Sequence, residues 1–137
     1  MTLINKLYES DNSRPQTFGS FIRQRREALG LSSRALALDL GLTPAYLMDI
    51  EKGNRAAPRK YFQALIDRLD ITGDDLATFY DLAGKSRNDQ YDDLNPYLGK
   101  REKARVALRV ARDLDLSNEA WQEIILHMQN MTNPADE

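Results

Sequence analysis

Three glycines divide residues 17–53 into short segments, and this spacing limits the possible fold more than any other feature of the chain. Each segment repeats apolar residues at helical spacing and ends at a glycine, which readily adopts the left-handed conformation found just past a helix end. The sequence has no sustained alternation of apolar and polar residues and no Asn-Gly or Asp-Gly hairpin turn. An all-α fold is therefore expected. The three glycines are Gly30, Gly41 and Gly53.

Each of the three expected helices has a start signal. Thr17 can cap the first helix, Ser32 or Ser33 the second, and Thr43 the third, because a hydroxyl oxygen accepts a hydrogen bond from the free backbone N–H groups there. Pro44 takes the first position of the third helix, where its missing N–H has no cost. The expected helices and their apolar residues are 17–29 with Phe18, Phe21, Ile22 and Leu29, 33–40 with Leu36, Ala37 and Leu40, and 43–52 with Leu47 and Ile50.

Four more helices are expected after Gly53. The fourth covers 59–69, and the fifth opens where Thr72 and Asp75 have the spacing of a capping box and ends near Gly84. The polar stretch that follows predicts a linker. Two further helices, 100–114 and one capped by Ser117, are joined by a short loop, which predicts an antiparallel helical hairpin. The expected parts are an N-terminal arm at 1–16, a five-helix domain at 17–84, a linker at 85–97, a C-terminal helical pair at 98–131 and a tail at 132–137.

Composition excludes several classes of function. The chain has no cysteine and a single histidine, His127, so neither a metal site nor a cofactor is expected. Asp74-Asp75 and Asp92-Asp93 are interpreted as cap and linker charges without an acid–base partner, and no enzymatic activity is expected. No apolar run reaches the roughly 18 residues of a membrane span, and the N-terminus lacks the apolar core of a signal peptide, which favours a cytoplasmic protein.

The charge balance weighs against a strongly basic nucleic-acid binder. The 137 residues include 19 basic and 21 acidic side chains, for a net charge of −2. The part up to Lys85 is nearly neutral, with 12 basic and 11 acidic residues. Binding to nucleic acid would therefore depend on local clusters of cations.

The second and third expected helices have the form of a helix-turn-helix motif. They are short, and they are joined by the Gly41-Leu42 turn, which needs a residue that tolerates a positive φ. The second helix of such a motif exposes its N-terminal face, so small or polar side chains are suitable there. Pro44, Ala45, Tyr46 and Asp49 fit that face.

Residues Phe18 to about Ala83 resemble the XRE, or Cro/CI, family of phage and bacterial repressors. The resemblance implies a helix-turn-helix transcriptional regulator, with repression as the expected activity, that binds a palindromic operator in double-stranded DNA as a homodimer. The residues that carry it, in the order shown by that family, are Arg26, Gly30 to Ser32, Leu36-Ala37, Gly41, Glu51, Gly53, Pro58, Ala64-Leu65 and Leu69.

The family also implies roles for particular positions. Arg26 and Glu51 correspond to a structural pair that ties the first helix to the end of the recognition helix, and an Arg–carboxylate fork suits this role. The DNA-binding positions are Thr43, Pro44, Ala45 and Asp49 at base edges, Tyr46 and Met48 beside them, and Ser33, Arg34, Asn54, Arg55, Arg59 and Lys60 near phosphates.

Several of these positions depart from the family pattern. Ser33 replaces the usual glutamine, and Pro44 and Ala45 replace long polar side chains, offering only apolar contact such as that with thymine methyl groups. Asp49 can accept a hydrogen bond from a cytosine amino group but repels phosphates. The operator sequence therefore does not follow from the family, and readout through DNA shape or through an arm containing Arg14 stays open.

The C-terminal helices carry an apolar stripe that is wide for a two-helix appendage. Lys100 to Met128 resembles, more weakly, the tails of XRE-type regulators from mobile genetic elements, some of which are cleaved by a neighbouring metallopeptidase. A homodimer held by Lys100 to Met131 is expected, with docking on the first domain or on a foreign regulatory protein as the alternatives. The alternative function is a protein-interaction module, an antitoxin or adaptor with weak or no DNA binding. The interface residues of the stripe are Trp121, Ile124, Ile125 and Met128.

Overall fold

The computed structural model describes residues 16–131, so most of the expected arm, including Arg14, and the tail at 132–137 lie outside the described residues. Every regular element in this range is helical, which confirms the all-α prediction, and none of these helices is long and apolar enough to cross a membrane. The chain divides into two compact units between Leu94 and Asn95. The helices are α2 (Phe18–Ala28), α3 (Ser33–Leu40), α4 (Pro44–Glu51), α5 (Phe62–Arg68), α6 (Asp74–Ser86), α7 (Asn95–Lys100), α8 (Glu102–Leu114) and α9 (Asn118–Gln129), with a 3₁₀ turn, η1 (Arg59–Tyr61), before α5.

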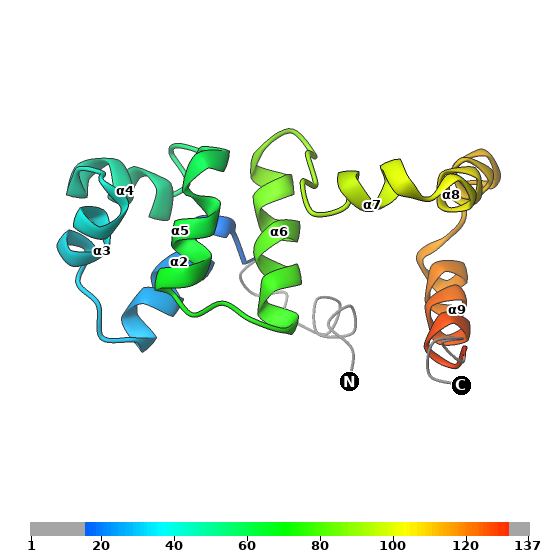
Figure 1. Cartoon of the computed structure of the whole chain (residues 1–137), viewed down its shortest axis with the longest axis horizontal. Coiled ribbons are helices and arrows are strands. Elements are labelled where there is room, and N and C mark those ends of the chain that lie inside the picture. Colours follow the sequence, from blue (N-terminus) through cyan, green and yellow to red (C-terminus); the bar gives the residue numbers. More distant parts are fainter. Residues whose placement is uncertain (1–15, 132–137) are drawn as a thin grey trace. The chain divides into compact units, whose positions relative to one another are not determined.

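The first unit is the expected five-helix domain, α2 to α6, packed around one apolar core. Its centre is a set of aromatic rings: Phe79 packs edge-on against Phe18 at 5.1 Å and against Phe62 at 5.2 Å between ring centres. Aromatic pairs prefer this geometry. In Figure 1, α3 and α4 lie side by side at one end of this unit and α6 lies at the other. Ile22, Leu36, Leu47, Leu65 and Leu69 are also fully enclosed.

Local start signals place the ends of α2, α3 and α4. The hydroxyl of Thr17 accepts from the Ser20 N–H at 3.1 Å, that of Ser32 from Ala35 at 3.0 Å, and that of Thr43 from Tyr46 at 3.1 Å. The second cap is therefore Ser32 and not Ser33. Satisfying these free N–H groups stabilises each helix start by about 1 kcal/mol.

The expected capping box of Thr72 and Asp75 is wrong. Gly73 occupies the cap position of α6 with φ 59° and ψ −133°, a conformation that side-chain-bearing residues rarely adopt, and no side chain caps this helix. Thr72 is consequently one residue too early, and α6 runs past Gly84 to Ser86. The fourth helix also differs, because residues 59–61 form the tighter η1 turn before α5 begins at Phe62.

Part of the polar stretch after α6 packs against the helical core of the first unit. The Arg87 guanidinium donates from Nη1 to the Ala57 carbonyl at 3.0 Å. The Tyr91 ring lies so close to Gly84 that a Cβ there would collide with it. Burial, and then the nearby Asp89 and Asp81 carboxylates, raise the pKa of Tyr91. The segment that leaves α6 is thus fixed to the loop that follows α4.

The second unit contains α7, α8 and α9, and Ser117 caps α9 as expected, accepting from the Ala120 N–H at 3.1 Å. The expected antiparallel hairpin is wrong in its packing. Figure 1 shows α8 nearly end-on and α9 from the side, so the two helices cross steeply. Asp115, at φ 50°, ends α8 in a left-handed turn that redirects the chain. In α8 and α9, Ala111 alone is buried.

Candidate nucleic-acid interface

A rigid turn joins α3 to α4. Gly41 has φ 72°, and the Leu42 N–H donates to the Ala37 carbonyl at 2.8 Å, while the Gly41 N–H donates to Leu38 at 3.1 Å. These are the two hydrogen bonds of a Schellman ending, which satisfies the last carbonyls of α3. Ala37 is completely enclosed. The turn therefore sets the direction of α4 relative to α3.

Gly19 brings α2 into direct contact with the end of α4. A Cβ at Gly19 would lie 2.7 Å from the carbonyl carbon of Glu51, and closer still to the carbonyl oxygens of Ile50 and Glu51. Only glycine permits this approach of two backbones. Sequence analysis did not identify this position, although a glycine inside a helical pattern, which costs stability, was an available signal.

The expected structural pair, Arg26 and Glu51, is in bidentate contact. Arg26 Nε and Nη2 each donate to a Glu51 carboxylate oxygen at 2.9 Å, and Nη1 donates to the Leu31 carbonyl at 2.9 Å. The side chains are only 12% and 6% exposed. The hydrogen bonds to Glu51 raise the pKa of Arg26 above its ordinary value. Together with Gly19, the pair holds the C-terminal end of α4 against α2.

The N-terminal face of α4 remains open. Leu47 and Ile50 are buried beneath the helix, Thr43, Pro44 and Ala45 are exposed, and Tyr46 and Asp49 are half-buried. Ala45 and Asp49 are one helical turn apart, so they share this face. No Lys or Arg lies within α4, whose charged residues are Asp49 and Glu51. Cations for an anionic partner must therefore come from neighbouring segments.

The expected phosphate-binding cations occupy different environments. Arg34 and Lys60 are exposed, and the Lys60 ammonium lies 5.2 Å from the centre of the Tyr61 ring. The Arg55 guanidinium lies over the Tyr46 ring, with 4.5 Å between its carbon and the ring centre. Ser33 is half-buried on α3, and Asn54 is exposed on the loop after α4. Lys52, exposed at the end of α4, is a further cation that sequence analysis did not single out.

Arg59 differs from the other cations because its guanidinium is already paired with an acidic and a polar side chain. Its Nε lies 2.7 Å from Asp92 Oδ2, and its Nη2 donates to Gln90 Oε1 at 2.6 Å. A phosphate at Arg59 would have to displace or share these partners. The sequence offered no signal for this pairing, since Arg59 and Asp92 come together only when the segment after α6 folds back.

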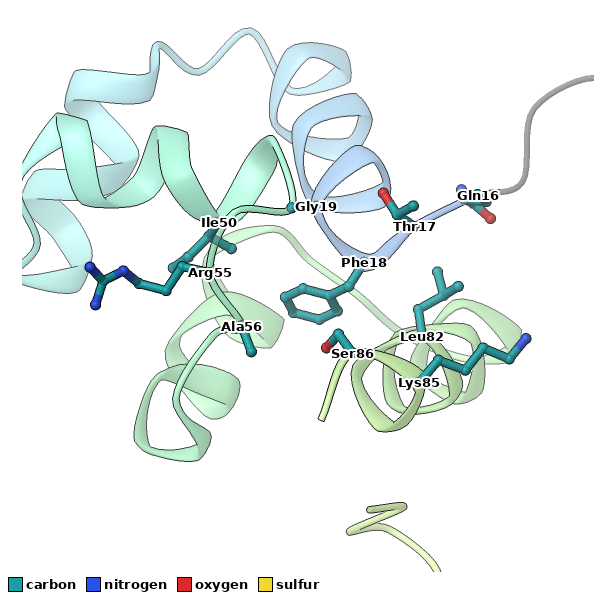
Figure 2. Close-up of a pocket in the computed structure, with 11 residues that line it drawn as sticks. Gln16, Thr17, Phe18, Gly19, Ile50, Arg55, Ala56, Leu82, Lys85 and Ser86 are labelled. Atoms are coloured by element: carbon teal, nitrogen blue, oxygen red, sulfur yellow. The ribbon is translucent and has the colours of Figure 1, made fainter. Parts of the chain in front are cut away.

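A cavity of about 380 Å³ lies between the start of α2, the loop after α4 and the end of α6. Figure 2 shows the Phe18 ring and Leu82 facing it, whereas the charged ends of Arg55 and Lys85 point away from it. No charged group converges on this apolar space. The open face of α4 and its flanking cations are therefore the better candidate for a nucleic-acid interface. Among residues 16–131, no three His, Asp or Glu side chains are grouped so that they could hold a metal ion.

The comparisons with known proteins agree with this geometry. The family model of a helix-turn-helix domain matches residues 17–79, which comprise α2 to α5 and the first half of α6. No curated protein and no solved structure matches the chain significantly. A helix-turn-helix domain indicates a DNA-binding regulator. The 17–79 segment, with its tight α3–α4 turn, is therefore identified as a helix-turn-helix domain of the XRE/Cro-like type.

Proposed function

We propose that this protein is a sequence-specific transcriptional regulator, a repressor that binds a palindromic operator as a dimer. The open N-terminal face of α4, held by the Schellman turn at one end and by Gly19 and the Arg26–Glu51 pair at the other, carries the proposal. A helix presented in this way enters the major groove with its first residues at base edges. Occupying an operator that overlaps a promoter would repress transcription without further machinery.

Base readout is assigned to Ala45 and Asp49, with Thr43 and Pro44 beside them. Phosphate contacts are assigned to Arg34, Asn54, Arg55 and Lys60, with Ser33 supporting them and Arg59 contributing only where its pairing with Asp92 opens. Each phosphate that a cation neutralises makes the affinity for DNA fall more steeply as the salt concentration rises.

Selection of a duplex from a random library by the full chain tests the proposal. A repressor of this kind enriches one palindromic motif, and its affinity falls steeply with salt. Arg55→Ala and Arg34→Ala each flatten the salt slope by about one unit without changing the motif. If no motif is enriched and binding does not depend on salt, the protein-interaction module becomes the better interpretation. The absence of Lys and Arg from α4 is the observation that favours this alternative.

Dimerisation is assigned to the second unit, residues 95–131, because its helices leave apolar side chains uncovered. Val110 is 52% exposed, Leu114 68%, Met128 52% and Met131 62%. Trp121, Ile124 and Ile125 of the expected stripe are only half-buried. Monomers rarely expose contiguous apolar patches beyond a few hundred Å². We therefore assign these faces to contact with a second copy.

Charge supports pairing of α8 from one copy with α9 from the other. In α8, Lys103, Arg105, Arg109 and Arg112 outnumber Glu102 and Asp113, whereas α9 carries Glu119 and Glu123 with no Lys or Arg. Opposite charges across an interface set orientation and disfavour pairing of like helices. Such a two-fold dimer would match a palindromic operator.

Sedimentation of the full chain and two variants tests the dimer. Leu114→Asp adds a charge to the exposed face of α8 and is expected to give monomers. The matched control is Leu38→Asp, at a position 79% exposed on α3, which is expected to stay dimeric. Monomeric wild-type protein, or a Leu114→Asp dimer as stable as wild type, would contradict this assignment and favour docking on the first unit or on a foreign partner.

A further inference from the structure

The proposed recognition helix, α4, contains no Lys or Arg, so positive charge beside it must come from other segments. Of its two charged residues, Glu51 is neutralised by Arg26, and Asp49 lies on the open face without an ion pair among the described residues. A carboxylate in that place repels the phosphates of an approaching duplex. A cation held beside the same face would offset this repulsion.

Arg55 is such a cation, and its location depends on an aromatic side chain of α4. Its guanidinium carbon lies 4.5 Å from the centre of the Tyr46 ring. Within residues 16–131 the Arg55 side chain makes no ion pair or hydrogen bond, so its N–H groups are free for a ligand. Figure 2 shows the side chain extending from the loop after α4 away from the Phe18 cavity.

Tyr46 is suited to hold this cation in place. It lies in the first turn of α4, where its backbone N–H is bonded to the Thr43 hydroxyl at 3.1 Å. Its ring is half-buried and packs against the hydrophobic core, which restricts its motion. A guanidinium stacked on an aromatic face uses its flat surface for the contact and keeps its N–H edge available for bidentate recognition.

We propose that Tyr46 is a positioning residue, whose ring holds the Arg55 guanidinium beside the Ala45–Asp49 face so that Arg55 binds a DNA phosphate there. The proposal rests on the proposed DNA-binding function. Because the side chain is ordered before DNA arrives, less conformational freedom is lost on binding, which favours affinity. Tyr46 acts through Arg55, so its ring matters and its hydroxyl does not.

A double-mutant cycle with the full chain tests this coupling, using the duplex that the wild-type protein enriches from a random library. Tyr46→Phe keeps the ring and is expected to bind like wild type. Tyr46→Leu removes the stack and is expected to lower affinity about two- to fivefold, the range of an exposed cation–π contact. In an Arg55→Ala background, Tyr46→Leu is expected to cause no further loss.

Two additional measurements separate positioning from a structural role. Ring currents from Tyr46 should shift the Arg55 side-chain proton signals in the NMR spectrum of the free protein, and Tyr46→Leu should abolish the shift. Arg55→Lys keeps the charge but loses the flat guanidinium fork, and it is expected to weaken binding about as much as loss of the Tyr46 ring. This variant therefore tests the proposal even if Tyr46→Leu fails to fold.

The outcomes are distinct. Equal affinity of Tyr46→Leu and Tyr46→Phe, an undiminished effect of Tyr46→Leu in the Arg55→Ala background, or Arg55→Lys binding like wild type would each overturn the positioning role and leave the DNA-binding function standing. Failure of the wild-type chain to enrich any duplex would overturn the proposed function and this inference together.

Discussion

Replacing Gly19 by alanine tests whether the contact between α2 and α4 positions the recognition helix. The new Cβ would lie 2.7 Å from the Glu51 carbonyl carbon, whereas ordinary carbon–carbon contacts are about 3.5–4.0 Å. The clashing atoms are backbone, so the helices must separate by roughly 1 Å. The Arg26–Glu51 hydrogen bonds, now 2.9 Å long, would then be stretched past good geometry.

The net cost follows from three contributions. Overpacking costs about 1–3 kcal/mol, and weakening the charge-assisted bonds adds about 1 kcal/mol. Alanine returns about 1 kcal/mol through its better helix propensity. We therefore expect Gly19→Ala to lower the free energy of unfolding by about 2 kcal/mol, which lowers the Tm of a domain of this size by about 10 °C.

Far-UV circular dichroism during heating is the suitable assay. Fluorescence of the single tryptophan is unsuitable, since Trp121 lies in α9 of the other unit. Gly99→Ala is the matched control, because that glycine is also helical but an added Cβ there meets nothing within 4 Å. The control should be as stable as wild type or slightly more so. If Gly19→Ala melted with the control, the close approach of α2 and α4, and the reasoning built on it, would be refuted.

Three further predictions concern single carboxylates. Glu51→Ala leaves the largely buried Arg26 guanidinium unpaired and should lower the free energy of unfolding in urea by about 3 kcal/mol; a loss below 1 kcal/mol would show that the pair is dispensable. Asp93 is exposed, but partial desolvation, and then the nearby Asp81 carboxylate, raise its pKa, so ionisation weakens folding slightly as the pH rises through that pKa. Asp93→Asn should therefore raise the Tm at pH 7, with the gain vanishing at acidic pH, and parallel pH profiles would contradict this. Asp49→Gln should change the preferred base at one position per half-site by about 1–3 kcal/mol in a library selection, whereas an unchanged motif would place readout elsewhere.

Much of the fold was predictable because its signals are local. Each of Thr17, Thr43 and Gly41 acts on backbone groups within a few residues, so the composition of a short window was enough to place the helix ends. The same reasoning failed at Thr72, where the unusual backbone of Gly73 moved the helix start by one residue. A local pattern identifies candidate cap residues, but only the backbone conformation decides which of two neighbours, here Thr72 or Gly73, is the cap.

For the candidate site, the sequence determined which positions belong to α4 and which face of it is open, because helical periodicity separates Leu47 and Ile50 from Ala45 and Asp49. Family resemblance added the pairing of Arg26 with Glu51, which the structure shows as a bidentate contact. Neither source identified Gly19 as the point where α2 meets α4.

The surroundings of the cations were decided by tertiary structure alone. Arg55 and Arg59 are near neighbours in the sequence with the same side chain, yet one lies over Tyr46 and the other is paired with Asp92. Likewise, the apolar stripe on α9 was readable from its spacing, but the steep crossing with α8 was not. Periodicity is a property of one segment, whereas an ion pair, a stacked ring or a crossing angle depends on which distant segment the folded backbone brings alongside it.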